Sequence, residues 1–156
     1  MPRSRVYVDT SVIGGYFDPE FERWTKALVD DFRSERLEPV LSELLAAELE
    51  DAPDRVRDLY AELRGRGTPV PVTPEVVELT GRYGAHAILP ARFRNDMTHI
   101  AIATIANADV VASWNFRHIV RFDKIRLFNA VNLEAGYKAI AVHSPREIAS
   151  DDSETK

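Results

Sequence analysis

Hydrophobic and polar residues alternate along this chain in two rhythms, one typical of strands and one typical of helices. Strands are predicted where short apolar runs occur: Arg5–Thr10, Glu38–Leu41, Pro69–Thr73, Asp109–Ser113 and Tyr137–His143. Helices are predicted where apolar residues recur at helical spacing: Pro19–Arg36, Glu43–Asp51, Pro53–Arg64, Pro74–Tyr83, Asp96–Asn107 and Arg126–Ala135. Strands that alternate with helices in this way indicate an α/β fold with a mainly parallel sheet.

Local signals refine several of these elements. Ser42 is expected to cap the helix that follows it, and Asn95 is expected to cap the helix over Asp96–Asn107. That second helix is apolar nearly all round, which predicts that it is buried. The prolines within Pro69–Thr73 favour a strand at the edge of the sheet.

Length and composition narrow the class of protein. The 156 residues suit one globular domain, expected over residues 1–149, followed by a polar, disordered tail over residues 150–156. The absence of cysteine excludes disulfides, zinc fingers, iron–sulfur clusters and thiol catalysis. No apolar run approaches the roughly 18 residues that a membrane helix needs, and no signal peptide opens the sequence. A cytoplasmic protein without membrane contact is therefore expected.

The charge is acidic on average but unevenly spread. The formal net charge is −5, with acidic side chains in excess over the first half and basic ones in excess over residues 81–149. An acidic average argues against a protein that simply coats nucleic acid. It leaves open a basic strip beside an acidic pocket.

Three carboxylates stand where the pattern predicts a strand end or the core. Asp9 follows an apolar strand directly, Glu48 lies in the apolar stripe of its helix, and Asp96 begins the most hydrophobic helix. Each has a structural interpretation as well: a turn aspartate for Asp9, a buried ion pair for Glu48, and helix capping for Asp96. If the three converge, they repel one another and need a cation.

The donor types suggest which cation that is. Oxygen ligands without histidine or cysteine suit Mg²⁺ or Mn²⁺ rather than zinc. A hard divalent ion held in this way can activate water and neutralise a phosphoryl oxygen, as phosphodiester hydrolysis requires. Because Asp and Glu are common residues, their spacing alone leaves the structural interpretations open.

Four segments together resemble the PIN-domain ribonucleases, which include the VapC-like toxins of type II toxin–antitoxin pairs. The segments are Val6–Ser11, Ser42–Leu49, Asn95–Ala103 and Ala108–Phe116, and their order and intervals match over residues 5–148. The resemblance implies a three-layer α/β/α domain with a metal-dependent acidic site at the strand ends. It also implies an endoribonuclease that uses Mg²⁺ or Mn²⁺, an antitoxin protein partner and a homodimer.

The resemblance assigns particular residues to the site. It maps three metal ligands onto this chain: Asp9, Glu48 and Asp96. It places hydroxyl groups beside them: Thr10, Ser11 and Ser113. The fourth catalytic position usually holds Asp, and here it is Asn115, which offers a carbonyl oxygen but no charge. Asp109 does not replace it because it begins the strand that Asn115 follows, and Asp123 is expected at the surface.

Cationic residues flank these positions: Arg92, Arg94, Arg117 and Arg121. Cations that border an acidic site can hold the phosphates of single-stranded RNA, although for any one of them a solvated charged face is the commoner explanation. Trp114 and Phe116 are expected to pack in the core, with base stacking as the alternative for one of them. His99 and His118 are left unassigned among metal ligand, base and structural group.

The leading functional hypothesis is a Mg²⁺- or Mn²⁺-dependent ribonuclease that acts as a toxin, with an RNA substrate. The alternative is a PIN-like domain, weak or inactive as a nuclease, that binds RNA or a protein. A third interpretation, an aspartyl phosphotransfer protein, is weaker because Asp9 lacks a second aspartate two residues later. The apolar stripe of Pro19–Arg36 is expected to serve an antitoxin or dimer contact.

Overall fold

The first strand of the chain lies in the middle of a five-stranded sheet. The computed structural model describes residues 2–67 and 69–150. The strand order is β3-β2-β1-β4-β5, and each neighbouring pair is parallel, which confirms the predicted parallel α/β sheet. The strands are β1 (Ser4–Val8), β2 (Leu37–Ser42), β3 (Pro69–Val70), β4 (Val110–Ala112) and β5 (Ala141–His143).

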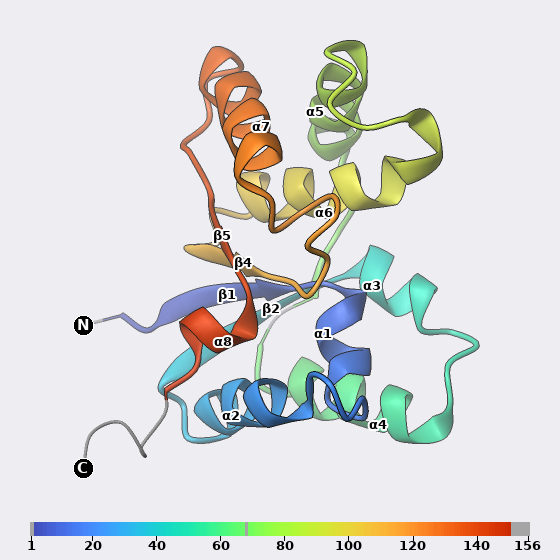
Figure 1. The fold of residues 1–156 in the computed structure, drawn as a ribbon, viewed down its shortest axis with the longest axis vertical. Coiled ribbons are helices and arrows are strands. Elements are labelled where there is room, and N and C mark those ends of the chain that lie inside the picture. Colours follow the sequence, from blue (N-terminus) through green and yellow to red (C-terminus); the bar gives the residue numbers. More distant parts are fainter. Residues whose placement is uncertain (1, 68, 151–156) are drawn as a thin grey trace.

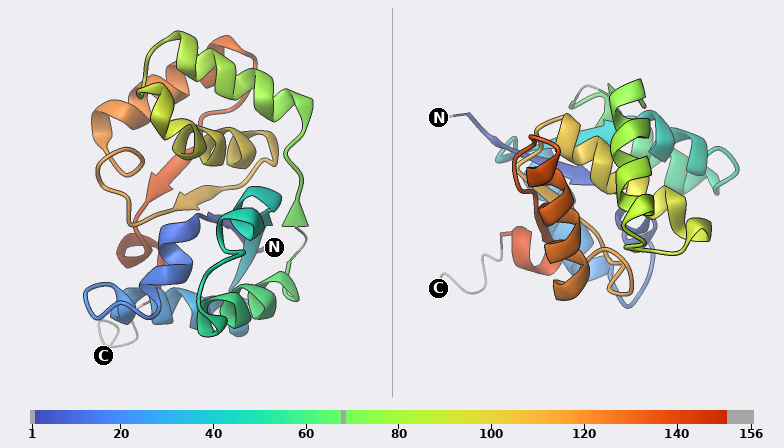
Figure 2. Two further views of the ribbon diagram at one scale, coloured as in Figure 1. Left: turned by 90° about the vertical axis from the view of Figure 1, so that its right-hand side faces the viewer. Right: turned by 90° about the horizontal axis from the view of Figure 1, so that it is seen from above.

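Helices cover both faces of this sheet, giving three layers (Figures 1 and 2). Side chains of β1 alternate between the layers because successive strand residues point to opposite faces. The helices are α1 (Thr10–Gly15), α2 (Glu22–Arg33), α3 (Glu43–Glu48), α4 (Asp54–Arg64), α5 (Pro74–Ala85), α6 (Arg94–Ile105), α7 (Phe122–Glu134) and α8 (Pro145–Ile148). Tyr7 packs in the cluster beneath α5, α6 and α7, whereas Val6 and Val8 pack in the cluster beneath α1, α2 and α4.

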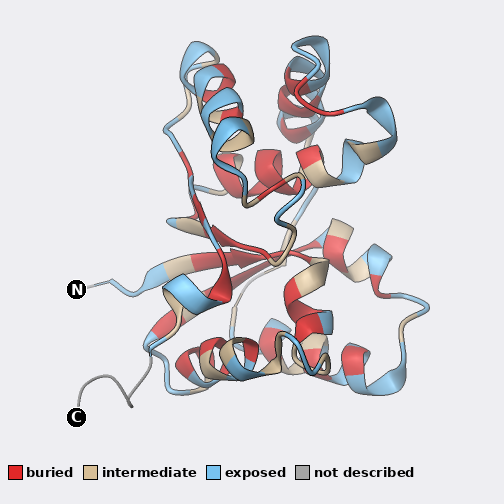
Figure 3. Ribbon diagram, in the orientation of Figure 1, coloured by how far each residue is buried: buried red, intermediate tan, exposed pale blue. Residues whose placement is uncertain are grey.

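Several local predictions are confirmed. The Ser42 hydroxyl accepts a hydrogen bond from Leu45 N at 3.1 Å and so caps α3. Strand β3 lies at the sheet edge. Helix α6 is buried from Met97 almost to its end, as its apolar composition predicted (Figure 3).

Other boundaries differ from the predictions. Asn95 does not cap α6, because the helix begins at Arg94, two residues before the prediction, and Asn95 lies in its first turn. Helix α7 begins at Phe122, four residues before the prediction, and the 76% exposure of Phe122 explains why no apolar period marks this start. Strand β5 is shorter than predicted. The short helices α1 and α8 were not predicted, since neither is long enough to show a helical period.

The apolar stripe of α2 is used inside the chain. Leu28 and Phe32 are buried in the cluster beneath the sheet, and Phe21 stacks on Trp114 at 4.6 Å between ring centroids. Leu28 and Phe32 are therefore not free for an antitoxin or a second copy, which corrects the expectation for these two residues of the stripe.

Gly67 gives a test of the close packing between the α4–β3 connection and β2. A Cβ atom at Gly67 would collide with the carbonyl oxygen of Pro39, whereas a Cβ atom at Gly81, within α5, would meet nothing within 4 Å. Gly67→Ala is expected to destabilise the fold by about 1–3 kcal/mol. Gly81→Ala is expected to stabilise it by about 0.5–1 kcal/mol. Denaturant unfolding measures both, and equal effects would contradict the close approach.

Asp31 ties the end of the described chain to α2. Asp31 is only 4% exposed. Its carboxylate accepts two hydrogen bonds from Arg36 and two from Ser150, the residue at which the disordered tail was predicted to begin. The remainder of that tail, residues 151–156, lies outside the described residues. Burial acts to raise the pKa of Asp31, but the Arg36 and Ser150 donors outweigh it and hold the pKa below its usual range.

The lowered pKa of Asp31 predicts acid-sensitive stability. The stabilisation is complete above the unfolded pKa of about 3.9 and is lost as the pH falls toward the folded pKa. Asp31→Asn is expected to lose about 1–3 kcal/mol at neutral pH and to show a flatter decline in stability below about pH 4. Asp30→Asn, at a 72% exposed side chain on the same helix, is the control and should follow the wild type. Urea unfolding over this pH range measures the free energy of unfolding of each variant. Equal values for Asp31→Asn and Asp30→Asn would contradict the prediction.

Candidate active site

The candidate residues gather where the sheet topology reverses. From β1 the chain moves outward to β2 and β3 on one side, then returns to β4 and β5 on the other. The carboxyl ends of β1 and β4 therefore form a topological switch point, the place where open α/β sheets bind ligands. Asp9 follows β1 directly, and Ser113 and Asn115 follow β4.

Asp9 is held at this point by neutral donors. Its Oδ1 accepts the Ser11 hydroxyl at 2.6 Å and Val12 N at 3.3 Å, and its Oδ2 accepts the Ser113 hydroxyl at 2.5 Å. The residue is only 4% exposed. Burial raises the pKa of Asp9, although His99 and the hydroxyl donors act against it. Ser11 and Ser113 thus lie beside Asp9, where the resemblance placed them.

Glu48 lies at the rim of the site and not within the core, since its side chain is 25% exposed. Its Oε1 lies 2.7 Å from the Thr10 hydroxyl and 2.6 Å from His99 Nε2. Burial acts to raise the pKa of Glu48, but the His99 and Thr10 contacts outweigh it and hold the pKa below its usual range. The partner of Glu48, for which a buried ion pair was one interpretation of the sequence, is therefore His99.

A chain of buried polar groups lies behind Glu48. His99 Nδ1 lies 2.5 Å from the Tyr7 hydroxyl, which lies 2.9 Å from the Ser42 hydroxyl. Burial raises the pKa of Tyr7 well above its usual value, so the phenol stays protonated. One arrangement satisfies every group: Ser42 donates to Tyr7, Tyr7 donates to His99 Nδ1, and His99 Nε2–H donates to Glu48. His99 thus fixes the direction of the Glu48 carboxylate.

Asp96 lies in the first turn of α6 and faces the segment after β4. Its Oδ2 lies 3.0 Å from His118 Nδ1 and 3.4 Å from Asn115 Nδ2. The side-chain oxygen Oδ1 of Asn115 accepts hydrogen bonds from the backbone N–H groups of Arg117 and His118, at 3.2 and 3.0 Å. Asn115 N in turn donates to the Ser113 hydroxyl at 2.9 Å, so Ser113 and Asn115 connect Asp9 to Asp96.

The donors suit a hard divalent cation in type, because the three candidate ligands are carboxylates and the donors that hydrogen-bond Asp9 are all neutral. A buried carboxylate with a raised pKa gains from a nearby cation. The arrangement is not a closed cage: within residues 2–67 and 69–150, no three His, Asp or Glu side chains form a group that could hold a metal ion. The carboxylates of Glu48 and Asp96 are each paired with one histidine instead.

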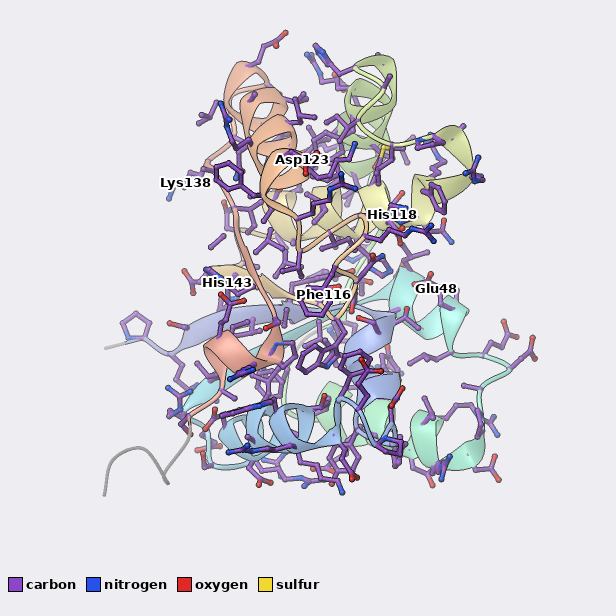
Figure 4. The ribbon with its side chains drawn as sticks, in the orientation of Figure 1. Glu48, Phe116, His118, Asp123, Lys138 and His143 are labelled. Carbon is purple, nitrogen blue, oxygen red and sulfur yellow. The ribbon has the colours of Figure 1, made fainter. Side chains whose placement is uncertain are left out.

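The remaining predicted residues divide into two groups. Arg92, Arg117 and Arg121 line one cleft together with His118, whereas Arg94 is exposed at the start of α6 and is not part of that lining. Trp114 is packed, with its Nε1 donating to Thr25 at 2.8 Å, but Phe116 is 51% exposed, which corrects the core prediction for Phe116. Figure 4 shows Phe116, His118 and Glu48 with the surrounding side chains.

Asp109 and Asp123 lie where they were expected. The Asp109 carboxylate accepts the backbone N–H of Arg5 at 2.7 Å. This contact lies at the amino ends of β1 and β4, whereas Asn115 lies beyond the carboxyl end of β4. Asp123 has a 55% exposed side chain that pairs with Arg121 at 2.8 Å.

Sequence reasoning missed the roles of Tyr7, His99 and His118. A signal for Tyr7 was available, because a buried tyrosine in a central strand needs a partner for its hydroxyl. His99 follows Asp96 by three residues and so lies one helical turn further along α6, on the same side of the helix. No sequence signal shows which carboxylate each histidine meets.

Comparison with known proteins identifies solved structures that share this fold. No protein-family model matches the chain, and no curated protein matches it in sequence. A chain in the crystal structure of VapBC2 from Rickettsia felis bound to a DNA fragment from its promoter matches with a TM-score of 0.57 at 10% identity, covering 90% of this chain and 98% of that one. FitAcB from Neisseria gonorrhoeae matches with a TM-score of 0.58 at 17% identity, covering 90% and 97%.

A third structure, FitAB bound to an IR36 DNA fragment, matches with a TM-score of 0.56 at 17% identity, covering 90% of this chain and 95% of that one. The chain therefore has the α/β fold found in VapBC and FitAB structures. The resemblance to VapC-like proteins is confirmed at the level of the fold. No helix among the described residues is long and apolar enough to cross a membrane.

Proposed function

We propose that this chain is a ribonuclease that hydrolyses RNA phosphodiester bonds with Mg²⁺ or Mn²⁺, and that it acts as the toxin of a toxin–antitoxin pair. The observation that carries the proposal is the gathering of Asp9, Glu48 and Asp96 around the carboxyl ends of β1 and β4. The fold shared with chains of VapBC and FitAB supports the toxin role and an antitoxin partner.

Each part of the site has a function in this proposal. Asp9, Glu48 and Asp96 would hold the divalent ion after their carboxylates move closer together than they lie in this structure, and the ion would supply charge neutralisation at the phosphoryl oxygen and an acidified water. Ser11 and Ser113 fix both oxygens of Asp9, and His99 fixes Glu48. Asn115 and His118 orient Asp96 from the segment after β4. Hydrolysis of this type leaves a 5′-phosphate and a 3′-hydroxyl.

Asp96→Asn is expected to abolish metal-dependent cleavage of single-stranded RNA, because it removes a ligand charge and weakens the contact with His118. The measurement compares cleavage in Mn²⁺, Mg²⁺ and EDTA by wild-type and variant proteins prepared identically. Asp109→Asn is the matched control, since Asp109 lies at the opposite edge of the sheet. Equal cutting by Asp96→Asn and wild type, or a 2′,3′-cyclic product, would contradict the proposal.

The second candidate function is an inactive domain that binds RNA or a protein. It is favoured by the neutral Asn115, whose carbonyl oxygen is engaged by backbone N–H groups rather than free for a metal. Thermal unfolding with added Mn²⁺ separates the two functions, because the nuclease should be stabilised by the ion it binds. An inactive binder need not respond, and failure to cut any of a panel of structured and unstructured RNAs would favour it.

A further inference from the structure

A cleft of about 300 Å³ lies beside the candidate site, between the short 3-10 helix η1 (Ala91–Phe93) and the segment that joins β4 to α7. Four of its lining side chains are cationic: Arg92, Arg117, Arg121 and Lys124. No carboxylate is among the described residues that line it. Its volume is at the lower end of the range for small-ligand sites.

The charge gathered in this cleft is notable because the whole chain is acidic, with a net charge of −5. Clustered like charges repel one another, and an anion bound among them removes that cost. Lys124 Nζ is fixed by a hydrogen bond to Ile88 O at 2.8 Å, and Arg121 is partly neutralised by Asp123. The Arg117 guanidinium has no side-chain or carbonyl acceptor within the described part of the chain.

The cleft meets the candidate active site at His118. His118 lines the cleft, and its Nδ1 lies 3.0 Å from Asp96 Oδ2. The His118 ring also packs on the Phe93 ring, with 4.0 Å between their centroids. The Arg92 guanidinium lies over the same Phe93 ring, 4.7 Å from its centroid. An anion bound in the cleft would therefore be separated from Asp96 by the His118 side chain.

We propose that this cleft binds a backbone phosphate of single-stranded RNA next to the phosphate that is cut, with Arg117 and Arg121 as the main contacts. The proposal rests on the proposed ribonuclease function. RNA is favoured over an acidic peptide because aromatic side chains border the cations: Phe93 lines the cleft, and Phe116, adjacent to Arg117, is 51% exposed and can stack on a base. Arg94, which is not part of the lining, has no role in this subsite.

The test measures binding of a short fluorescein-labelled single-stranded RNA in EDTA, and its cleavage in Mn²⁺, for Arg117→Ala and Arg121→Ala. Arg57→Ala is the matched control, because Arg57 and Arg121 both have 51% exposed side chains paired with an aspartate, and Arg57 lies on α4. Each cleft variant should weaken RNA binding on the order of tenfold. Each should also reduce the slope of log K against log salt by about 0.7, the value for one phosphate of a single strand. In Mn²⁺, KM should rise while kcat stays near that of Arg57→Ala.

The outcomes separate this proposal from the proposed function. If the wild type neither binds nor cuts RNA, the ribonuclease function fails and the subsite fails with it. If the wild type binds and cuts, but the cleft variants behave like Arg57→Ala, the subsite alone is overturned. If oligo-glutamate of equal charge displaces the RNA as well as unlabelled RNA does, the cleft recognises negative charge in general and its assignment to RNA is overturned.

Discussion

Asp9→Asn is expected to abolish RNA cleavage and, at the same time, to stabilise the metal-free protein. The Asn carbonyl oxygen can still accept the Ser11 hydroxyl and the backbone N–H that caps α1, and its amide nitrogen can donate to the Ser113 hydroxyl, so the local structure should persist. The substitution removes a buried charge that only neutral donors contact and whose pKa burial raises. We expect cleavage to fall by about a thousandfold or more, and stability in EDTA to rise by about 1 kcal/mol.

Thermal unfolding in EDTA and single-turnover cleavage in Mn²⁺ measure the two effects of this substitution. Asp123→Asn, at an exposed aspartate, is the control and should change neither. A clear loss of stability in Asp9→Asn would show that the carboxylate charge is compensated in the folded protein. Retained cleavage would remove Asp9 from the catalytic site.

His99→Leu is expected to lower kcat for RNA cleavage by about 10- to 100-fold, the usual cost of losing the group that orients a ligand. His99 is 2% exposed and is therefore out of reach of bound RNA, so KM for RNA should change little. The physical reason is that Glu48 loses the donor 2.6 Å from its Oε1 and is free to turn. Leu also leaves the Tyr7 hydroxyl with Ser42 as its remaining partner.

A matched control for His99 lies elsewhere in the chain. His143, the last residue of β5, lies 3.1 Å from Glu147 of α8, and both side chains are half-exposed. His143→Leu should leave kcat unchanged. Tyr7→Phe tests the next group along, since it removes the donor that sets the proton on His99 Nε2. A fall in kcat for Tyr7→Phe smaller than that for His99→Leu fits a positioning chain. A rise in KM without a change in kcat for His99→Leu would contradict it.

The parallel sheet could be predicted because short apolar runs alternate with helical periods along the chain, whereas its three layers were expected from the resemblance. Helix α6 was predicted from its apolar surface, and β3 was placed at the edge from its prolines. Short elements such as α1 and α8 leave no period to detect, and the exposed start of α7 shows none.

The candidate site was predictable in its residues but not in its contacts. Asp9, Glu48 and Asp96 all reach the carboxyl edge, as their positions after strands and at helix ends indicated. Their partners lie far away in the chain: Glu48 meets His99, 51 positions on, and Asp96 meets His118, 22 positions on. Such pairings depend on how the layers pack, which residue spacing does not specify.

The hydrogen bond from Ser113 to Asp9 has a consequence for the order of events during synthesis. It joins residues 104 positions apart, and the two residues follow strands on either side of the switch point. Contacts so distant in sequence form late, after the intervening chain has been made and closed. The first strand of the nascent chain therefore leaves the ribosome long before its aspartate has a complete environment. If the chain cuts RNA, it acquires that activity only after the segment that carries Ser113 has been translated and has paired with β1.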